Sequence, residues 1–496
     1  MKNRTSARFD LSDAIAANLA SKGGEALLHF DSCWIDWKWL REFCDHVAPV
    51  FARAHTVGLV ARVRPTHIAT IAANVRDRRS TAFIYSAQTS SGIASDIRRL
   101  RLPVVVADSG DWNETTLRAA SEAGSIAVAT SESDARIAIL SPGTAPVIAK
   151  GDPDIAFRLL SSGTTGPPKR VPIRWDTAAQ LVANSRTAYV GSDNADAPQI
   201  MASPLGNVAG LVYTLPVLAL GGRLVLLDRF EPQAWAEAVR DHRPVRGALT
   251  PTGVRMVLDA QVRREWLESL QVIGVGGSRL DEELQAEFES RYGIPVLPAY
   301  GATEFGGVIA NWSVDAYQEW GRRKRGSVGR AGTGVALRVV DQGSGHVLGP
   351  GEQGLLEAKV DRIGASWIRT TDLASLDEDG FLFIHGRADG AINRGGFKIL
   401  PDAVANVVRQ HPAVADAAVI GCADHRLGEA PVAAVELRVG QNVSPIAIRS
   451  WCRDRMLAYQ VPARIVILDA LPRNLSGKVA LTALKEILSS KAMDQA

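Results

Sequence analysis

From about residue 57 the chain alternates short apolar runs with segments of helical pattern. Apolar runs at 57–62, 82–86 and 103–107 are each separated by a segment long enough for a helix. This alternation predicts βαβ units, in which a largely parallel sheet is covered by helices on both faces. The pattern returns at 222–277, where an apolar run ends in glycine. Such sheets bind ligands at the carboxyl ends of their strands, so we expect the chemistry there.

The later part of the chain has a different pattern. Residues 335–383 contain short β-rich runs between turn signals, which predict an antiparallel subdomain. The last hundred residues or so carry their own helices and strands, enough for a small domain with its own core. We therefore predict an α/β fold with two domains. Residues 1–388 form a large N-terminal domain of parallel αβ-layered sheets plus an antiparallel β subdomain, and residues 389–496 form a small C-terminal α+β domain.

Composition excludes several classes of protein. With 46% hydrophobic and 22% charged residues, the chain is typical of a folded globular protein. Lys plus Arg outnumber Asp plus Glu by only 56 to 53, so we expect no nucleic-acid partner. The four cysteines lack CxxC spacing, which favours reduced thiols. The start has no apolar signal core, and Gly221, Gly222 and Arg223 interrupt the most apolar stretch, so we expect a cytoplasmic protein without a membrane segment.

A polar turn follows the buried strand pattern that begins at residue 155. It reads SSGTTGPPKR and offers hydroxyls, backbone N–H groups and an ammonium, which together suit a polyphosphate. No Gly-Lys-Ser/Thr closes it, and two prolines remove backbone donors, so it is not a Walker loop. The nucleotide-binding candidates here are Ser161, Ser162, Gly163, Thr164, Thr165 and Gly166, with Lys169 as a catalytic cation.

The string SSGTTGPPK resembles the phosphate-binding signature of the adenylate-forming superfamily, which includes acyl-CoA synthetases, luciferases and peptide-synthetase adenylation domains. YGATE at 300–304 looks like that family's adenine and metal motif. The resemblance implies that Tyr300 stacks on adenine, Thr303 contacts the α-phosphate and Glu304 holds Mg²⁺. An aromatic face suits a purine, and a carboxylate suits a hard cation. Further nucleotide contacts implied by the resemblance are Gly276, Gly277, Ser278, Ala299 and Gly301.

Three later segments are similar to signatures of the same family. In residues 370–390 the resemblance implies that Asp372 accepts the ribose hydroxyls and Arg387 contacts the nucleotide. It places Asp389 at the hinge about which a mobile C-terminal domain turns. PRNLSGK implies that Lys478 bridges the attacking carboxylate and the α-phosphate. NRGGFKI at 393–399 resembles the loop lining the pantetheine tunnel, which makes Arg394, Gly395, Gly396 and Lys398 candidates for coenzyme A contact.

The expected acyl pocket departs from the family in one place. Many relatives carry Pro-Leu-Phe-His-x-x-Gly, whereas residues 204–210 read PLGNVAG, so the gate is smaller and not ionisable. No acidic residue occurs between 201 and 227 to hold a substrate ammonium, which favours a plain carboxylic acid over an α-amino acid. The lining candidates are mostly small or apolar and suit an aromatic, alicyclic or fatty acyl group: Asn207, Thr252, Gly277, Gly301 and Val308.

The resemblance implies an ATP-dependent, AMP-forming carboxylic acid–CoA ligase that uses ATP, Mg²⁺ and coenzyme A. Two alternatives stay open. A stand-alone adenylating enzyme would load the phosphopantetheine of a carrier protein, and only the demand for free coenzyme A separates it from a ligase. A non-catalytic ligand-binding relative would release no pyrophosphate with any acid, although it would have no need of the complete set of charged residues found here.

Overall fold

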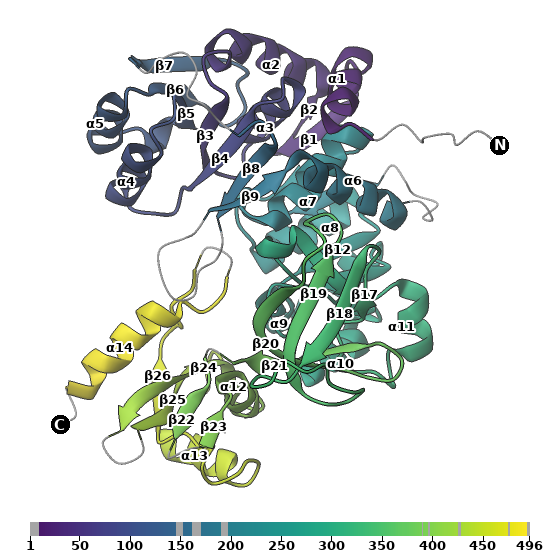
Figure 1. Cartoon of the computed structure of the whole chain (residues 1–496), viewed down its shortest axis with the longest axis vertical. Coiled ribbons are helices and arrows are strands. Elements are labelled where there is room, and N and C mark those ends of the chain that lie inside the picture. The colour runs from purple at the N-terminus through teal and green to yellow at the C-terminus, as the bar shows by residue number, and fades with distance from the viewer. Residues whose placement is uncertain are drawn as a thin grey trace.

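The computed structural model describes residues 9–144, 152–160, 170–189, 197–388, 390–394, 397–424, 428–474 and 477–493. It confirms the predicted α/β class, with a large N-terminal region of several sheets and a smaller C-terminal unit. Figure 1 shows the first part of the chain at the upper end and the C-terminal elements at the lower end. Within the described ranges, no helix has both the length and the apolar character needed to cross a bilayer.

A seven-stranded sheet forms the upper end of the molecule. Five inner strands run parallel, and the edge strands β7 and β9 run antiparallel to their neighbours. In spatial order the strands are β7 (Ile137–Pro142), β6 (Ile126–Thr130), β5 (Val104–Asp108), β3 (Thr56–Ala61), β4 (Ser80–Tyr85), β8 (Ile155–Leu160) and β9 (Arg170–Arg174). Both faces are buried, as the apolar runs predicted, by α2 (Trp37–Phe51) and α3 (Pro65–Arg76) on one side and α4 (Ser90–Leu100) and α5 (Glu114–Ala123) on the other.

A four-stranded sheet lies beside it. Its spatial order is β10 (Gln199–Met201), β11 (Leu224–Leu226), β1 (Ala26–Phe30) and β2 (Cys33–Asp36). The packed helices in this region are α1 (Leu11–Ser21), α6 (Trp175–Tyr189) and α7 (Val208–Leu220). Gly221 ends α7 with φ of +78°, a left-handed conformation that glycine adopts without strain, so the most apolar stretch is split between a helix and a strand as predicted.

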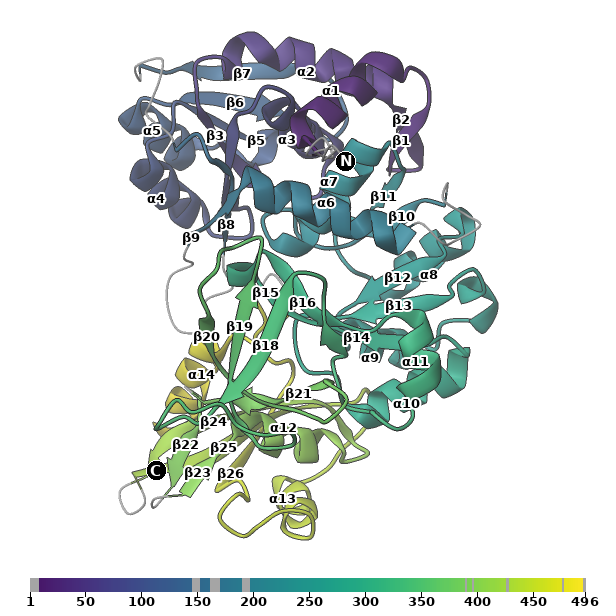
Figure 2. The same cartoon turned by 45° about the vertical axis from the view of Figure 1, so that its right-hand side comes forward.

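A three-stranded parallel sheet carries the first part of the site. It consists of β12 (Arg246–Leu249), β13 (Val272–Val275) and β14 (Val296–Pro298), and it appears beside its helices in Figure 2. These helices are α8 (Pro232–His242), α9 (Pro251–Asp259) and α10 (Glu282–Tyr292), with the short 3₁₀ turn η2 (Arg264–Leu267) between them. A separate apolar cluster that includes Trp235, Val254 and Phe288 holds them on the sheet.

The predicted antiparallel subdomain is confirmed. Strands β18 (Val335–Val340), β19 (Gly354–Val360), β20 (Ile368–Leu376) and β21 (Leu382–Arg387) pair as a meander. A smaller antiparallel sheet precedes it and contains β15 (Tyr300–Ala302), β16 (Gly307–Asn311) and β17 (Arg330–Ala331). Two short helical elements complete this region, η3 (Thr303–Phe305) and α11 (Val314–Trp320), and η1 (Ser109–Asp111) follows β5 in the first sheet.

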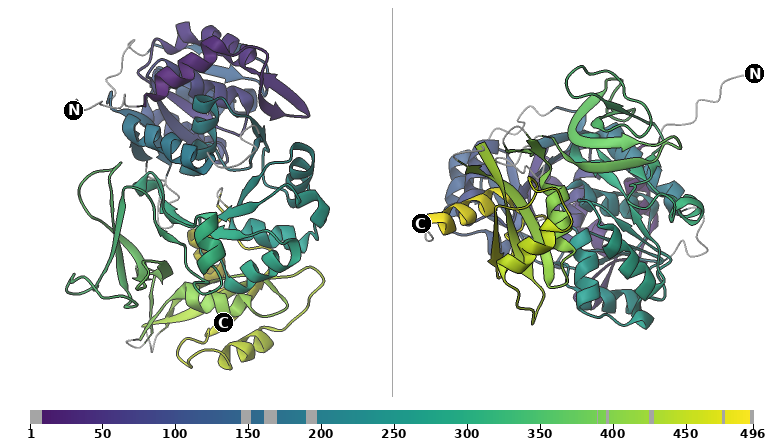
Figure 3. Two further views of the ribbon diagram at one scale, coloured as in Figure 1. Left: turned by 90° about the vertical axis from the view of Figure 1, so that its right-hand side faces the viewer. Right: turned by 90° about the horizontal axis from the view of Figure 1, so that it is seen from below.

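The C-terminal unit has its own sheet and core, seen below the rest in the left view of Figure 3. Its strands are β22 (Ile392–Arg394), β23 (Phe397–Ile399), β24 (Val414–Asp424), β25 (Gly428–Leu437) and β26 (Arg464–Leu468), with β26 parallel to β25. Its helices are α12 (Pro401–Arg409), α13 (Pro445–Arg453) and α14 (Leu481–Met493). The contact of α12 with β21 joins this unit to the antiparallel subdomain.

Candidate active site

Three turns meet at the carboxyl edge of the β12–β14 sheet. Leu249 pairs with Val275, and Val275 pairs with Pro298, so the three parallel strands end in register. The residues that follow them, among them Gly276 and Ala299, therefore lie side by side. Backbone hydrogen bonds extend the pairing one residue further, from the Gly276 N–H to the Leu249 carbonyl and from the Ala299 N–H to the Val275 carbonyl. The sheet thus collects the predicted nucleotide residues at one edge.

The turn after β13 needs glycine at residue 277. Gly277 has φ of +91°, which L side chains rarely adopt. A Cβ placed there would lie 3.8 Å from Cε of Lys478. Gly277 therefore faces the arm of a lysine that is 201 positions later in the sequence.

The turn after β12 begins a helix. Thr250 caps α9, and its Oγ1 accepts the Gly253 N–H at 3.1 Å while Pro251 occupies the first helical turn. The predicted pocket residue Thr252 lies in this first turn and is half-buried. The cap therefore fixes Thr252 in the helical turn that directly follows β12.

Tyr300 and Asp372 are joined by a hydrogen bond. The Tyr300 hydroxyl donates to Oδ2 of Asp372 across the two antiparallel sheets. Burial raises the pKa of Tyr300 above its usual range, and the Asp372 carboxylate acts in the same direction, so the phenol remains protonated and donates. The structure thus brings the predicted adenine residue to the predicted ribose residue.

Gly301 is a glycine for a reason of backbone packing. A Cβ at this position would lie 2.4 Å from the Gly307 carbonyl oxygen and 2.6 Å from Cα of Val308. The neighbouring strand β16 therefore excludes any side chain there. The Val308 side chain is 47% exposed, which leaves it available to an acyl group.

Asp372 and Arg387 face each other on paired strands, β20 and β21. The Arg387 guanidinium donates to Oγ1 of Thr371 at 2.9 Å, and the Asp372 backbone N–H donates to Oγ1 of Thr370 at 3.1 Å. These bonds hold the paired backbone of β20 and β21 where the two predicted nucleotide residues lie.

Glu304 lies on the short turn η3 with Thr303. Gly306 ends the turn with φ of +64°, and its N–H donates to the Thr303 carbonyl at 2.9 Å. The Glu304 side chain is exposed. In the described part of the chain, no hydrogen bond or ion pair engages its carboxylate, so its oxygens are available to a cation.

Lys478 reaches this cluster from the C-terminal unit. The Asn474 side chain accepts the Lys478 N–H at 3.0 Å, and the Asn474 N–H donates to the Lys478 carbonyl at 2.7 Å. Arg473 ties the same segment to Asp416 at 2.7 Å. These contacts pair the backbone of Lys478 with Asn474 and hold the neighbouring Arg473 on the C-terminal unit.

The electrostatic surroundings of Lys478 place it among the predicted site residues. Burial lowers the pKa of Lys478, and the charge of Arg387 acts in the same direction. The carboxylates of Asp372 and Glu304 act in the opposite direction. Residues 304, 372, 387 and 478 therefore interact at one place, although they come from three separate regions of the chain.

Asn207 has a structural role as well as its predicted place in the pocket. It is the N-cap of α7, where its Oδ1 accepts the Gly210 N–H at 3.0 Å. Its amide oxygen is thus committed to the helix. The next residue, Val208, lies 3.6 Å from the position of a Cβ on Gly307, so the start of α7 packs against β16.

Arg170, the last residue of the segment SSGTTGPPKR, has a carboxylate partner in the structure. Its guanidinium donates to Oδ2 of Asp96 at 2.9 Å and to the Phe83 carbonyl at 3.3 Å. Burial by itself would raise the pKa of Asp96, but the bonds from Arg170 and Arg99 outweigh it and lower the pKa. The arginine therefore anchors the start of β9 to α4.

The remaining predicted site residues lie in the C-terminal unit or outside the described part of the chain. Arg394 donates to the carbonyls of Tyr459 at 2.7 Å and Val461 at 3.3 Å, both within the C-terminal unit. The backbone of Lys398 belongs to β23, but its side chain lies outside the described part. Also outside the described residues are Ser161, Ser162, Gly163, Thr164, Thr165, Gly166, Lys169, Asp389, Gly395 and Gly396.

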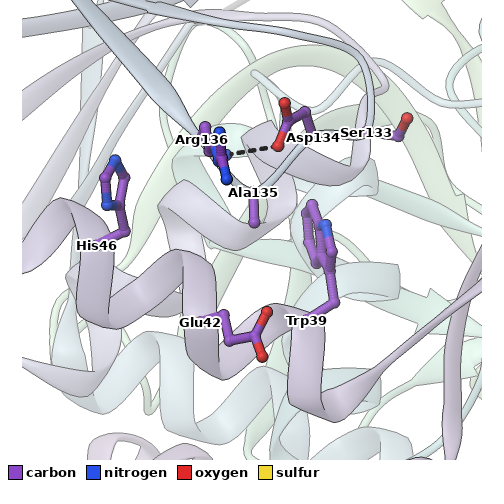
Figure 4. Close-up of a pocket in the computed structure, with 7 residues that line it drawn as sticks. All are labelled: Trp39, Glu42, His46, Ser133, Asp134, Ala135 and Arg136. Carbon is purple, nitrogen blue, oxygen red and sulfur yellow. Dashed lines mark hydrogen bonds between the residues drawn. The ribbon is translucent and has the colours of Figure 1, made fainter.

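A groove of about 450 Å³ lies elsewhere, between α2 and residues 133–136 (Figure 4). Trp39, Glu42 and His46 line it from the helix, and Arg136 faces them from the segment before β7. None of the predicted site residues contributes to its lining, so it is separate from the candidate active site.

Sequence reasoning missed one residue that contacts the site. Arg362 follows β19 and binds the backbone on both sides of the turn after Glu304. No motif marks it, and its contacts lie 54 and 57 positions away in the sequence.

Comparison with known proteins gives consistent matches. The family model described as AMP-binding enzyme matches residues 16–360, and the model for the AMP-binding enzyme C-terminal domain matches residues 403–478. The chain is 30% identical to 4-coumarate–CoA ligase-like 5 of Oryza sativa subsp. japonica, over 66% of this chain and 61% of the relative. It is 31% identical to the indoleacetate–CoA ligase of Aromatoleum aromaticum, over 67% of each chain. The alignments thus span about two thirds or less of these relatives.

Among solved structures, ATP-bound MatB from Rhodopseudomonas palustris has a TM-score of 0.82 at 23% identity, covering 96% of this chain and 98% of that one. The apo form of the same protein gives a TM-score of 0.68. The arrangement of the present chain is therefore more similar to that of the ATP-bound form.

Proposed function

The chain belongs to the AMP-binding enzyme family, and from this membership we propose that it is an ATP-dependent, AMP-forming ligase that joins a carboxylic acid to coenzyme A. The observation that carries the proposal is the position of Lys478. Its Cε lies against Gly277, and its charge interacts with Glu304 and Asp372. A cation at this point would reduce the repulsion between an attacking carboxylate and the phosphates of ATP.

In the first half-reaction, an oxygen of the substrate carboxylate attacks the α-phosphorus of ATP. The bond to pyrophosphate breaks, and an acyl-adenylate forms. Both reactants are anionic, so the Lys478 ammonium would neutralise charge and orient the carboxylate. Asp372 would accept the ribose hydroxyls, and Tyr300, held by Asp372, would stack on adenine. Lys169 and the segment from Ser161 to Gly166 would hold the departing phosphates.

The residues present fit a magnesium ion. The exposed Glu304 carboxylate makes no hydrogen bond or ion pair within the described part of the chain. No group of three His, Cys, Asp or Glu side chains that could hold a metal occurs among those residues either. This donor set suits Mg²⁺, which usually takes one or two carboxylates and completes its shell with phosphates and water. Bound there, the ion would offset phosphate charge.

In the second half-reaction, the thiol sulfur of coenzyme A attacks the acyl carbon. The carbon–sulfur bond forms, the bond to the phosphate oxygen of AMP breaks, and the thiol proton is lost. We propose that residues 389–496 turn about Asp389 between the two steps, so that Gly395 and Gly396 replace Lys478 beside the reacting atoms. Glycines would let the thin pantetheine arm pass close to the backbone.

The acid is proposed to carry an aromatic, alicyclic or fatty acyl group. The described lining candidates are small or apolar except for the two polar residues Asn207 and Thr252. The relatives named for 4-coumarate and indoleacetate are consistent with an aromatic acid. We propose that the reaction takes place in the cytoplasm, which the lack of CxxC spacing among the four cysteines and the burial of Cys44 and Cys452 support.

The test is pyrophosphate release with ATP and Mg²⁺ across aromatic, alicyclic, short-chain and long-chain acids, with and without coenzyme A. Turnover that requires coenzyme A, with acyl-CoA as the product, supports the ligase. Release that requires a phosphopantetheinylated carrier protein instead would make the chain a carrier-loading enzyme. No release with any acid would favour a ligand-binding relative.

A further inference from the structure

Arg362 lies two residues after β19 and reaches across to the turn that carries Glu304. Its Nε donates to the Phe305 carbonyl at 2.9 Å, and its Nη2 donates to the Val308 carbonyl at 2.9 Å. One planar guanidinium therefore binds the last residue of η3 and the second residue of β16. These two carbonyls flank Gly306 and Gly307, so the arginine spans the whole bend.

A second contact anchors Arg362 itself. The Thr177 hydroxyl, from the first turn of α6, donates to the Arg362 carbonyl at 2.9 Å. Gly306 packs into the corner between them, where a Cβ would lie 2.6 Å from Cγ2 of Thr177 and 3.6 Å from Nε of Arg362. Three elements distant in sequence thus converge at Gly306, two residues after Glu304.

The Arg362 charge has no carboxylate partner among the described residues. Two arginines of the β18–β21 sheet do have a carboxylate partner. Arg338 and Arg369 form ion pairs with Glu357 at 2.6 and 2.7 Å. Partial burial also lowers the pKa of Arg362. A half-buried cation bonded only to carbonyls forms charge-assisted hydrogen bonds, which are stronger than neutral ones.

We propose that Arg362 is a positioning residue for the adenylation step, which holds the turn that presents Thr303 and Glu304 to magnesium-bound ATP. The inference rests on the proposed function and adds a residue to it. Without the guanidinium, the two carbonyls lose their donors, and the bend after Glu304 loses its hydrogen-bonded link through Arg362 to α6. The Glu304 carboxylate then occupies a wider range of positions, and the Mg²⁺ complex binds less tightly.

The test compares Arg362→Met, Arg362→Lys and Thr177→Val with the wild type. Thr177→Val keeps the Cγ2 that packs on Gly306 and removes only the hydroxyl. Arg338→Met is the matched control, because it also removes a guanidinium that makes two bonds in the same sheet. Two measurements are made: calorimetric binding of ATP with and without Mg²⁺, and the Mg²⁺ dependence of pyrophosphate release.

We expect Arg362→Met to weaken binding of Mg²⁺–ATP about tenfold and to raise the half-saturating Mg²⁺ concentration by a similar factor, with metal-free ATP binding nearly unchanged. Arg362→Lys, which keeps the charge and one donor, falls between Met and wild type, and Thr177→Val shows a smaller change in the same direction. Acyl transfer from pre-made acyl-adenylate to coenzyme A is unaffected.

Two results would overturn the inference. One is an Arg362→Met protein with an unchanged Mg²⁺ dependence. The other is an equal loss in every measurement, matched by Arg338→Met and by a lower melting temperature, which would make Arg362 a general structural residue. Failure of the proposed function looks different, because the wild type itself would then neither bind Mg²⁺–ATP nor release pyrophosphate.

Discussion

The turns after β12, β13 and β14 and the segment around Lys478 contribute to the same site in different ways. The three turns belong to one parallel sheet whose strands end in register, so hydrogen bonding within the sheet sets their relative positions. Lys478 has its own contacts with Asn474, and the neighbouring Arg473 binds Asp416, but this segment belongs to another unit. The predicted nucleotide-binding edge is therefore fixed within one sheet, whereas the proposed catalytic cation, Lys478, comes from a different unit.

The largest effect is expected from removing the Lys478 ammonium alone. Lys478→Ala should lower adenylation by about 10² to 10³-fold, because one preorganised charge at the reacting atoms is lost. Transfer from pre-made acyl-adenylate to coenzyme A should be unchanged. Pyrophosphate release and acyl-CoA formation measure the two steps separately.

The control for that variant is Lys485→Ala, an exposed lysine on α14 of the same unit. It should leave both steps at the wild-type rate. Equal loss of both steps in Lys478→Ala would contradict the assignment of the lysine to adenylation.

The pH profile sharpens the same assignment. The pKa of Lys478 is lowered by burial, so its ammonium loses its proton below the usual lysine range. If the protonated form is the active one, adenylation should fall about tenfold per pH unit once the pH exceeds this lowered pKa. Lys478→Arg stays charged, so its alkaline decline should move to higher pH or vanish. An identical alkaline limb in both proteins would show that another group is responsible.

The turn after β13 can be altered at Gly277, where it contacts Lys478. Gly277→Leu would extend a side chain into the space next to Lys478 Cε and should reduce adenylation by tenfold or more. It also places a side chain at φ of +91°, which costs about 1 kcal/mol of folding stability. Initial rates and urea unfolding measure the two effects.

The variant Gly351→Leu separates the loss of stability caused by backbone strain from the loss of activity caused by a side chain next to Lys478. Gly351 has φ of +81°, and no atom lies within 4 Å of the point that a Cβ would occupy, so the variant carries the same backbone strain without any site contact. It should lose similar stability and no activity. If both variants lose activity alike, strain and not obstruction of the lysine explains the result.

The smallest effect is expected from breaking an ion pair between the C-terminal unit and the β12–β14 region. Arg438 of the C-terminal unit pairs with Asp259 at the end of α9, at 3.4 Å, and both side chains are partly exposed. Exposed pairs contribute about 0–1 kcal/mol, so Arg438→Ala should lower the ratio of adenylation to thiol transfer by at most about fivefold. Single-turnover rates of the two half-reactions give that ratio.

Arg255→Ala is the matched control, because it breaks an ion pair with Glu287 within the N-terminal part. It should not change the ratio. The double variant Arg438→Asp with Asp259→Arg should restore the ratio toward wild type, and a further decline would argue against a direct interaction.

Much of the fold followed from local patterns. The alternation from residue 57 predicted the parallel sheet, and the turn signals in 335–383 predicted the meander of β18 to β21. Side-chain periodicity is imposed by which face of an element is buried, so it is visible in a short window. The order of strands was not predicted, because β8 lies beside β4 through pairing that no local signal encodes.

The candidate site shows the same difference between local sequence signals and long-range contacts at the level of single residues. The strings YGATE and PRNLSGK gave Tyr300, Glu304 and Lys478 as candidates because they resemble family signatures that are local in the sequence. No such string marks Arg362 or the partner of Arg170. Their bonds to the Phe305 carbonyl and to Asp96 join residues 57 and 74 positions apart.

The amino-acid order alone thus determined which groups are available: the phosphate segment, the aromatic ring, the carboxylates and the terminal lysine. Only the tertiary structure decided that Gly277 faces Lys478, that Tyr300 binds Asp372 and that Arg362 spans the bend after Glu304. The physical reason is that side-chain chemistry is a property of each residue, whereas proximity depends on packing among elements far apart in the chain.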